Sequence, residues 1–88
     1  PSGKGMLFLF SMEQPVAMWM KDTLIPLDML FINRQGTIIF IKENAQPQSL
    51  DIIESPAHAK AVIELQAGTV NRYRIKVGDK VEHAVFFR

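Results

Sequence analysis

Short apolar runs separated by polar stretches that contain proline or glycine dominate the chain, and this pattern predicts strands. The first run, Met6–Phe10, is continuously apolar and rich in aromatic residues, which is typical of a buried strand. Ile25 precedes a proline and is therefore biased toward extended geometry. Val16–Met20 could form a strand or one helical turn before the polar triplet 21–23. We favour strands on both sides of this triplet, in Val16–Met20 and in Leu27–Ile32.

A hairpin is predicted in the middle of the chain. Leu27–Ile32 and Thr37–Ile41 are rich in strand-forming residues, and the four residues between them end in Gly36, which can adopt a left-handed conformation. The second strand is apolar at four consecutive positions, so both of its faces should be covered, as in a sandwich or barrel.

The second half of the chain predicts less regular structure. Glu43–Pro56 contains two prolines and several polar residues, which indicates a long irregular connection, and loops of this length are often functional. His58–Leu65 alternates between apolar and polar residues, as expected for a half-exposed strand. Thr69 is expected to cap a single helical turn that ends before Ile75. Val81–Phe87 should form the last strand, so the predicted fold class is mainly β: a small antiparallel β barrel or sandwich with one or two short helical turns.

Composition limits the function classes. The 88 residues suffice for a single domain, residues 1–88, and the net charge of +1 is too small to indicate nucleic acid, a membrane surface or an acidic substrate. The chain has no cysteine, which excludes disulfides, thiolate zinc sites and a cysteine nucleophile. No apolar run approaches the roughly 20 residues of a membrane helix. No cofactor is expected, since His58 and His83 lack metal-site spacing and no glycine-rich phosphate loop is present.

The first candidate site lies around Trp19. This tryptophan is expected to be a core anchor, with ligand stacking as the alternative. Lys21, Asp22 and Thr23 follow it directly, and Asp28 lies just beyond them. Charges beside so much apolar surface need a partner or exposure to solvent, so these side chains either form a site or occupy a solvated turn.

The second candidate cluster consists of Glu43, Asn44 and Gln46, whose carboxylate and amide groups could orient a ligand through hydrogen bonds. In an antiparallel hairpin the start of one strand lies beside the end of the other. Asp28 and Glu43 should therefore share one end of the sheet. We expect the two clusters together to form a non-enzymatic binding site for a small ligand or a protein segment.

Two other functions remain open. An enzyme could use Asp28 and Glu43 as acid and base, with Lys21 stabilising negative charge. A regulator could bind nucleic acid through the basic cluster Arg72–Lys80, although a solvated surface is the better interpretation of such a cluster.

Several short motifs occur in a characteristic order: Gly5–Phe10, Trp19–Asp28, Glu43–Pro47, Glu64–Leu65 followed by Gly68, and Gly78–Asp79. In this order and spacing they resemble the bacterial and archaeal family named domain of unknown function 192. The resemblance covers almost the whole chain and implies a small, mostly antiparallel β domain without an established activity.

The resemblance also sets three expectations. The family pattern has asparagine where this chain has Asp22, so a role that needs a neutral donor there is in doubt. The family domain extends upstream of Gly5 by a strand that this chain lacks, and the resulting exposed sheet edge favours a homodimer. Relatives often follow a signal peptide, which favours a periplasmic or extracellular location, while the residues themselves leave the cytoplasm open.

Overall fold

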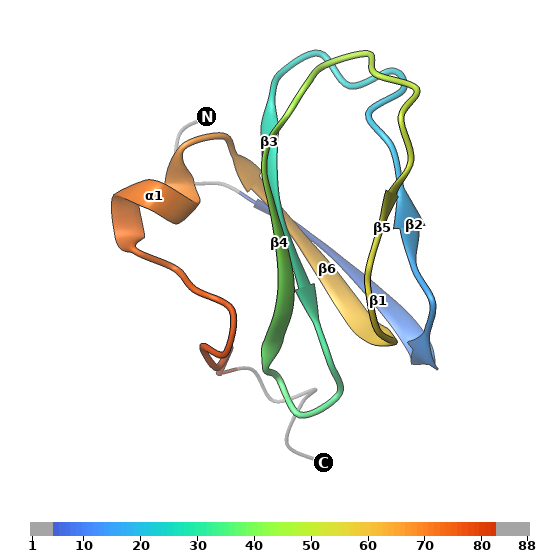
Figure 1. Ribbon diagram of the computed structural model, residues 1–88, viewed down its shortest axis with the longest axis vertical. Coiled ribbons are helices and arrows are strands. Elements are labelled where there is room, and N and C mark those ends of the chain that lie inside the picture. The colour runs from blue at the N-terminus through green and yellow to red at the C-terminus, as the bar shows by residue number, and fades with distance from the viewer. Residues whose placement is uncertain (1–4, 83–88) are drawn as a thin grey trace.

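The computed structural model describes residues 5–82 and consists of six strands and one short helix (Figure 1). These elements are, in chain order, β1 (Gly5–Gln14), β2 (Ala17–Met18), β3 (Leu27–Ile32), β4 (Ile38–Ala45), β5 (Ile53–Glu54), β6 (Ala59–Gln66) and α1 (Thr69–Tyr73). The expected last strand, Val81–Phe87, lies outside the described residues except for its first two positions, which are not strand.

The strands form two antiparallel sheets. The larger sheet has the order β1-β6-β3-β4, and β2 pairs with β5 in a small second sheet. The second sheet lies over one face of the larger sheet, and α1 lies on the opposite side (Figure 1). The mainly β, antiparallel fold class is thus confirmed, and the sheets do not close into a barrel.

The predicted hairpin is present. β3 and β4 pair antiparallel with Leu30 opposite Ile41, and Gly36 adopts the left-handed conformation with φ of 84°. Asn33 stabilises the turn because its side-chain oxygen accepts hydrogen bonds from the backbone N–H groups of Gln35 and Thr37. The second strand begins at Ile38 rather than at Thr37, which instead forms an isolated bridge with Lys80.

Each face of the larger sheet carries its own apolar cluster. Because β3 is central and covered on both faces, its residues alternate between the two clusters: Met29 and Phe31 belong to one, Leu30 and Ile32 to the other. The same holds for β6, where Val62 faces the second sheet and Ala61 faces α1. The expectation that β6 is half exposed is therefore wrong, because the second sheet lies over one of its faces and α1 lies over the other.

The first strand is present but differs in burial from the prediction. Within residues 5–82, β1 pairs only with β6 and lies at one edge of the described sheet. Its large apolar side chains are consequently exposed at four positions: Met6, Leu7, Leu9 and Met12. The continuous apolar run of β1 therefore does not predict a buried strand. At the edge of the described sheet, β1 has a neighbouring strand on one side only, and this leaves much of its apolar surface exposed.

The predicted long connection is shorter than expected. β4 continues through Glu43 and Asn44 to Ala45, and β5 interrupts the remainder of the segment. The helical turn after Gly68 is confirmed as α1, but Gly68 occupies the N-cap position, and the Thr69 hydroxyl donates a hydrogen bond to the Gln66 carbonyl instead. No helix within residues 5–82 is long and apolar enough to cross a membrane.

Candidate functional site

The segment Trp19–Ile25, here called the Trp19 turn, connects β2 to β3 and is held by backbone hydrogen bonds. The carbonyl of Met20 accepts from the N–H groups of Thr23 and Gln48, each at 3.0 Å, and the same N–H of Gln48 donates to Thr23 at 3.1 Å. The N–H of Met20 donates to Ser49 at 3.3 Å. The loop after β4 thus runs beside the Trp19 turn at the top of Figure 1 and fixes its conformation.

Met20, and not Trp19, anchors this turn in the core. The Met20 side chain is 1% exposed and belongs to the cluster of Met29 and Phe31, whereas Trp19 is 47% exposed. The expectation that Trp19 is a core anchor is therefore wrong. A continuous apolar run in an extended segment points successive side chains to opposite sides, so only one of these two neighbours could enter the core.

Lys21 lies against the exposed tryptophan. Its Nζ is 5.3 Å from the centroid of the Trp19 ring, a cation–π distance that stabilises exposed sites by about 0.5–1 kcal/mol. Asp22 follows with a φ of 63°, in the left-handed region. Lys21 and Asp22 are both exposed, which agrees with a solvated turn.

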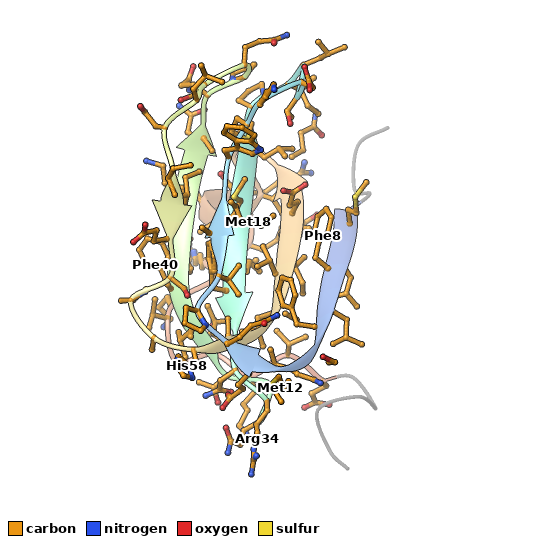
Figure 2. The ribbon with its side chains drawn as sticks, turned by 90° about the vertical axis from the view of Figure 1, so that its right-hand side faces the viewer. Phe8, Met12, Met18, Arg34, Phe40 and His58 are labelled. Carbon is orange, nitrogen blue, oxygen red and sulfur yellow. The ribbon has the colours of Figure 1, made fainter. Side chains whose placement is uncertain are left out.

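A groove of about 910 Å³ separates the Trp19 turn from the end of the larger sheet. The Trp19 turn forms one wall and the strands β1, β6 and β3 form the other (Figure 2 labels Phe8 and Met18, which lie on β1 and β2). The apolar lining residues are Met6, Phe8, Met18, Trp19, Leu24, Ile25, Leu27 and Leu65, and the polar ones are Lys21, Asp22, Thr23, Glu64 and Gln66.

Glu64 is the half-buried acidic residue of this groove. It lies on β6 between Met6 of β1 and Met29 of β3, on the same face of the sheet as the buried Val62. Burial raises the pKa of its carboxyl above the ordinary value of 4.5, because a low dielectric disfavours the ionised form. Within residues 5–82 its side chain makes no hydrogen bond or ion pair.

Glu64 is not among the candidate residues that the sequence predicts, because its strand was expected to be half exposed. A carboxylate between Ile63 and Leu65 was the available signal. Gly5 lets β1 approach β6 closely at this point. A Cβ there would lie 2.8 Å from Leu65 Cδ2 and 2.9 Å from the Glu64 carbonyl oxygen.

Asp28 lies on the other face of the sheet and is 1% exposed. One of its carboxylate oxygens accepts a hydrogen bond from the Asn44 N–H at 2.9 Å, and the other accepts from Gly68 at 3.1 Å and from Val70 at 2.9 Å. Asp28 thus links β3 to β4 and to the start of α1. Both oxygens are engaged by the protein's own backbone.

The second predicted cluster, Glu43, Asn44 and Gln46, lies at the end of the sheet where the antiparallel β3–β4 pairing is expected to place it. Leu27 pairs with Ala45, so Asp28 and Glu43 do share one end of the sheet, and a register shift sets Asn44 in the left-handed region with φ of 53°. Glu43, Asn44 and Gln46 are exposed, and the Gln46 side-chain amide donates to the Asn44 carbonyl at 2.9 Å.

The groove therefore brings together four of the eight predicted site residues, Trp19, Lys21, Asp22 and Thr23, and adds Glu64. Asp28, Glu43, Asn44 and Gln46 do not line it. The Glu43–Pro47 motif instead leads directly into Gln48 and Ser49. The backbone groups of these two residues form the hydrogen bonds that fix the Trp19 turn.

The remaining chemistry-bearing residues lie elsewhere. His58 is exposed directly before β6, and His83 lies outside the described residues. No group of three or more potential metal ligands occurs within residues 5–82. In the basic cluster, Arg72 lies 5.6 Å from the ring centroid of the exposed Tyr73, and Asp79 accepts a hydrogen bond from the Lys76 N–H.

Comparison with known proteins gives one family and two solved structures. The family domain of unknown function 192 (DUF192), described as an uncharacterized ACR, matches residues 1–83. No curated protein matches the chain.

A crystal structure from Sinorhizobium meliloti 1021, described as a candidate transcription regulator, is 54% identical with a TM-score of 0.89 over 91% of this chain. A protein of unknown function from Novosphingobium aromaticivorans DSM 12444 is 34% identical with a TM-score of 0.90 over 94% of this chain. The chain spans 62% and 59% of the length of these two proteins.

Proposed function

Because the chain belongs to the DUF192 family, which is described only as uncharacterized, we propose its function from the groove: a non-enzymatic module that binds a small, largely apolar ligand. The observation that carries the proposal is the half-exposed Trp19, the chain's one tryptophan, at the wall of an apolar groove.

The size and lining of the groove support a small ligand. Ligand pockets commonly measure about 300–1,000 Å³ and combine apolar walls with a few polar groups, and the groove's 910 Å³ fall in that range. Exposed apolar surface of this kind is costly in water and frequently marks a binding site. Trp19 and Leu24 both remain exposed beside the groove although the core takes up their neighbour Met20.

The hydrogen bonds of Asp28 favour binding over the carboxylate-based enzyme. That hypothesis requires Asp28 to exchange a proton with a substrate. Both of its oxygens accept backbone hydrogen bonds at 2.9–3.1 Å, and its side chain is almost fully buried. Backbone N–H groups of β4, of Gly68 and of α1 occupy both oxygens, so a structural role fits this residue better.

Titration with 1-hexanol, a neutral apolar probe, tests the proposal. Binding in the groove should change the Trp19 emission and shift the amide resonances of lining residues such as Phe8 and Leu65. Trp19→Ala should weaken binding by about tenfold, the equivalent of about 1.4 kcal/mol. The control is Tyr73→Ala, which removes an exposed ring from α1 on the opposite side of the sheet. Shifts spread over both faces of the sheet, or equal effects of the two variants, would contradict the proposal.

Nucleic-acid binding is a second hypothesis. Arg72, Arg74, Lys76 and Lys80 are exposed, and the description of the Sinorhizobium meliloti protein is compatible with it. Binding through these residues requires the affinity for a labelled DNA duplex to fall by at least about tenfold between 50 and 200 mM salt, because each phosphate contact releases counterions. An anisotropy titration without salt dependence would remove this hypothesis.

Self-association through β1 is a separate prediction. An edge strand of ten residues with exposed apolar side chains can pair with a second copy. Light scattering at high protein concentration should then give the mass of a dimer, and Leu9→Lys should restore the monomer. A monomeric wild type would refute this prediction.

A further inference from the structure

Glu64 carries an inference about the charge of the ligand, and this inference rests on the proposed function. The groove contains two acidic side chains, Asp22 and Glu64. Asp22 is exposed on the turn, where water solvates it, whereas Glu64 is half buried among apolar neighbours. A carboxylate that has lost part of its hydration gains most from a partner.

No residue within 5–82 supplies that partner. Glu64 makes no hydrogen bond or ion pair with any described residue, and no fully buried side-chain oxygen within residues 5–82 lacks a partner. The Glu64 oxygens are therefore accessible from the groove. Lys21, the basic lining residue, lies against the Trp19 ring instead of pairing with Glu64.

We propose that the ligand carries a cationic nitrogen, of the kind found in primary alkylammonium ions, which pairs with the Glu64 carboxylate while its apolar chain lies against Trp19 and Met18.

The positions of Lys21 and Glu64 set the orientation of the ligand within the groove. Lys21 places a positive charge at the Trp19 ring, so a second cation there would be repelled. Glu64 on β6 offers the opposite charge on the other wall. The apolar side chains that line the groove leave a path suited to an alkyl chain.

Charge pairing should be stronger here than at the surface. An ammonium group donates charge-assisted hydrogen bonds to a carboxylate, and these are roughly twice as strong as neutral ones. The apolar surroundings reduce screening by water and thereby strengthen the pair. The same surroundings disfavour the ionised form of the Glu64 carboxyl when no ligand is bound. A bound cation would offset this cost and favour the ionised carboxylate.

A matched set of probes tests this inference at pH 7: n-hexylammonium, neutral 1-hexanol and anionic hexanoate, which share a chain length. We expect n-hexylammonium to bind at least about tenfold more tightly than 1-hexanol, and hexanoate to bind most weakly. Titrations followed by Trp19 emission and by amide shifts give the three dissociation constants.

Glu64→Gln keeps the shape of the side chain and removes the charge. In this variant n-hexylammonium and 1-hexanol should bind equally, while 1-hexanol binds as it does to the wild type. Glu54→Gln removes an exposed carboxylate from β5, outside the groove. This variant should keep the tenfold preference.

The outcomes separate this inference from the proposed function. If 1-hexanol binds in the groove as tightly as n-hexylammonium, the ligand is not cationic and the proposed function stands. If the preference survives in Glu64→Gln or disappears in Glu54→Gln, the pairing with Glu64 is wrong. If none of the three probes binds to a folded wild type, both proposals fail.

Discussion

The carboxylate of Asp28 accepts a 2.9 Å hydrogen bond from the backbone N–H of Val70, which lies 42 residues further along the chain. The backbone N–H groups of Gly68 and Asn44 donate two further hydrogen bonds to the same carboxylate. Asp28 thus acts in place of a helix cap, since the N-cap residue Gly68 has no side chain to bond the first turn of α1. A single buried side chain holds three backbone segments together.

Replacing Asp28 should be costly for stability. Asp28→Ala leaves three backbone N–H groups without their acceptor, and we expect it to lower the free energy of unfolding by about 3–5 kcal/mol. Asp28→Asn retains one carbonyl oxygen and should cost about 1–3 kcal/mol. Urea unfolding followed by circular dichroism measures both. Glu43→Gln, an exposed change in the neighbouring strand, should stay within about 0.5 kcal/mol, and a loss comparable to that of Asp28→Asn would contradict this assignment.

Adjacent residues of the Trp19 turn should have opposite effects on stability and binding. Met20→Ala opens a cavity in the core and should cost about 2–5 kcal/mol of unfolding free energy. Trp19→Ala removes a half-exposed ring and should cost less, while weakening ligand binding. Thermal unfolding of the two variants checks the order, and a larger loss for Trp19→Ala would show that its ring is a core residue in solution.

Asp22 adopts the left-handed conformation, with φ of 63°, and this explains why asparagine suits the position. Asp22→Asn should leave stability unchanged or raise it slightly, because asparagine adopts this conformation readily. Asp22→Val should cost about 1–2 kcal/mol, since a β-branched residue is strained there. Asp51→Val is the control at an exposed position without positive φ. Equal losses for the two valine variants in urea unfolding would contradict the backbone argument.

Glu64 should give the unliganded protein an unusual pH dependence. Because burial raises the pKa of this carboxyl in the folded state, the folded protein binds the proton more tightly than the unfolded chain does. The contribution of Glu64 to stability is therefore fully present below the ordinary value of 4.5 and is lost as the pH rises through the raised pKa. Measured from pH 4 to 8, the stability difference between Glu64→Gln and wild type should shift in favour of the variant as the pH rises. A difference that is constant with pH would contradict this prediction.

Local patterns predict much of this fold. The β3–β4 hairpin follows from two apolar runs and a glycine at the turn, and the helical turn follows from Gly68 and Thr69. These features depend on neighbours in the chain, so the residues alone reveal them. The antiparallel register likewise predicts that Asp28 and Glu43 share one end of the sheet.

Other features depend on partners that are distant in the chain. Trp19 and Met20 are equally apolar neighbours, and only the packing of β2 over Met29 and Phe31 decides which of them is buried. Glu64 lies in a groove because β6 pairs with both β1 and β3. The alternation of its strand predicts a polar face but not what lies opposite that face.

The amino-acid sequence by itself thus determined β1, β2, β3, β4 and β6, the hairpin, the single turn of helix and the polar Trp19 turn, because these follow from backbone preferences and from the side-chain period of two. It did not determine β5, which lies in a segment whose composition predicts an irregular connection. The tertiary structure decided which candidate residues share a site. Two residues on one strand point to the same or to opposite faces by the period alone, but strand order and the layers over each face decide what covers them. That is why Asp28 became a buried link to α1 and Glu64 a half-buried carboxyl in the groove beside Trp19.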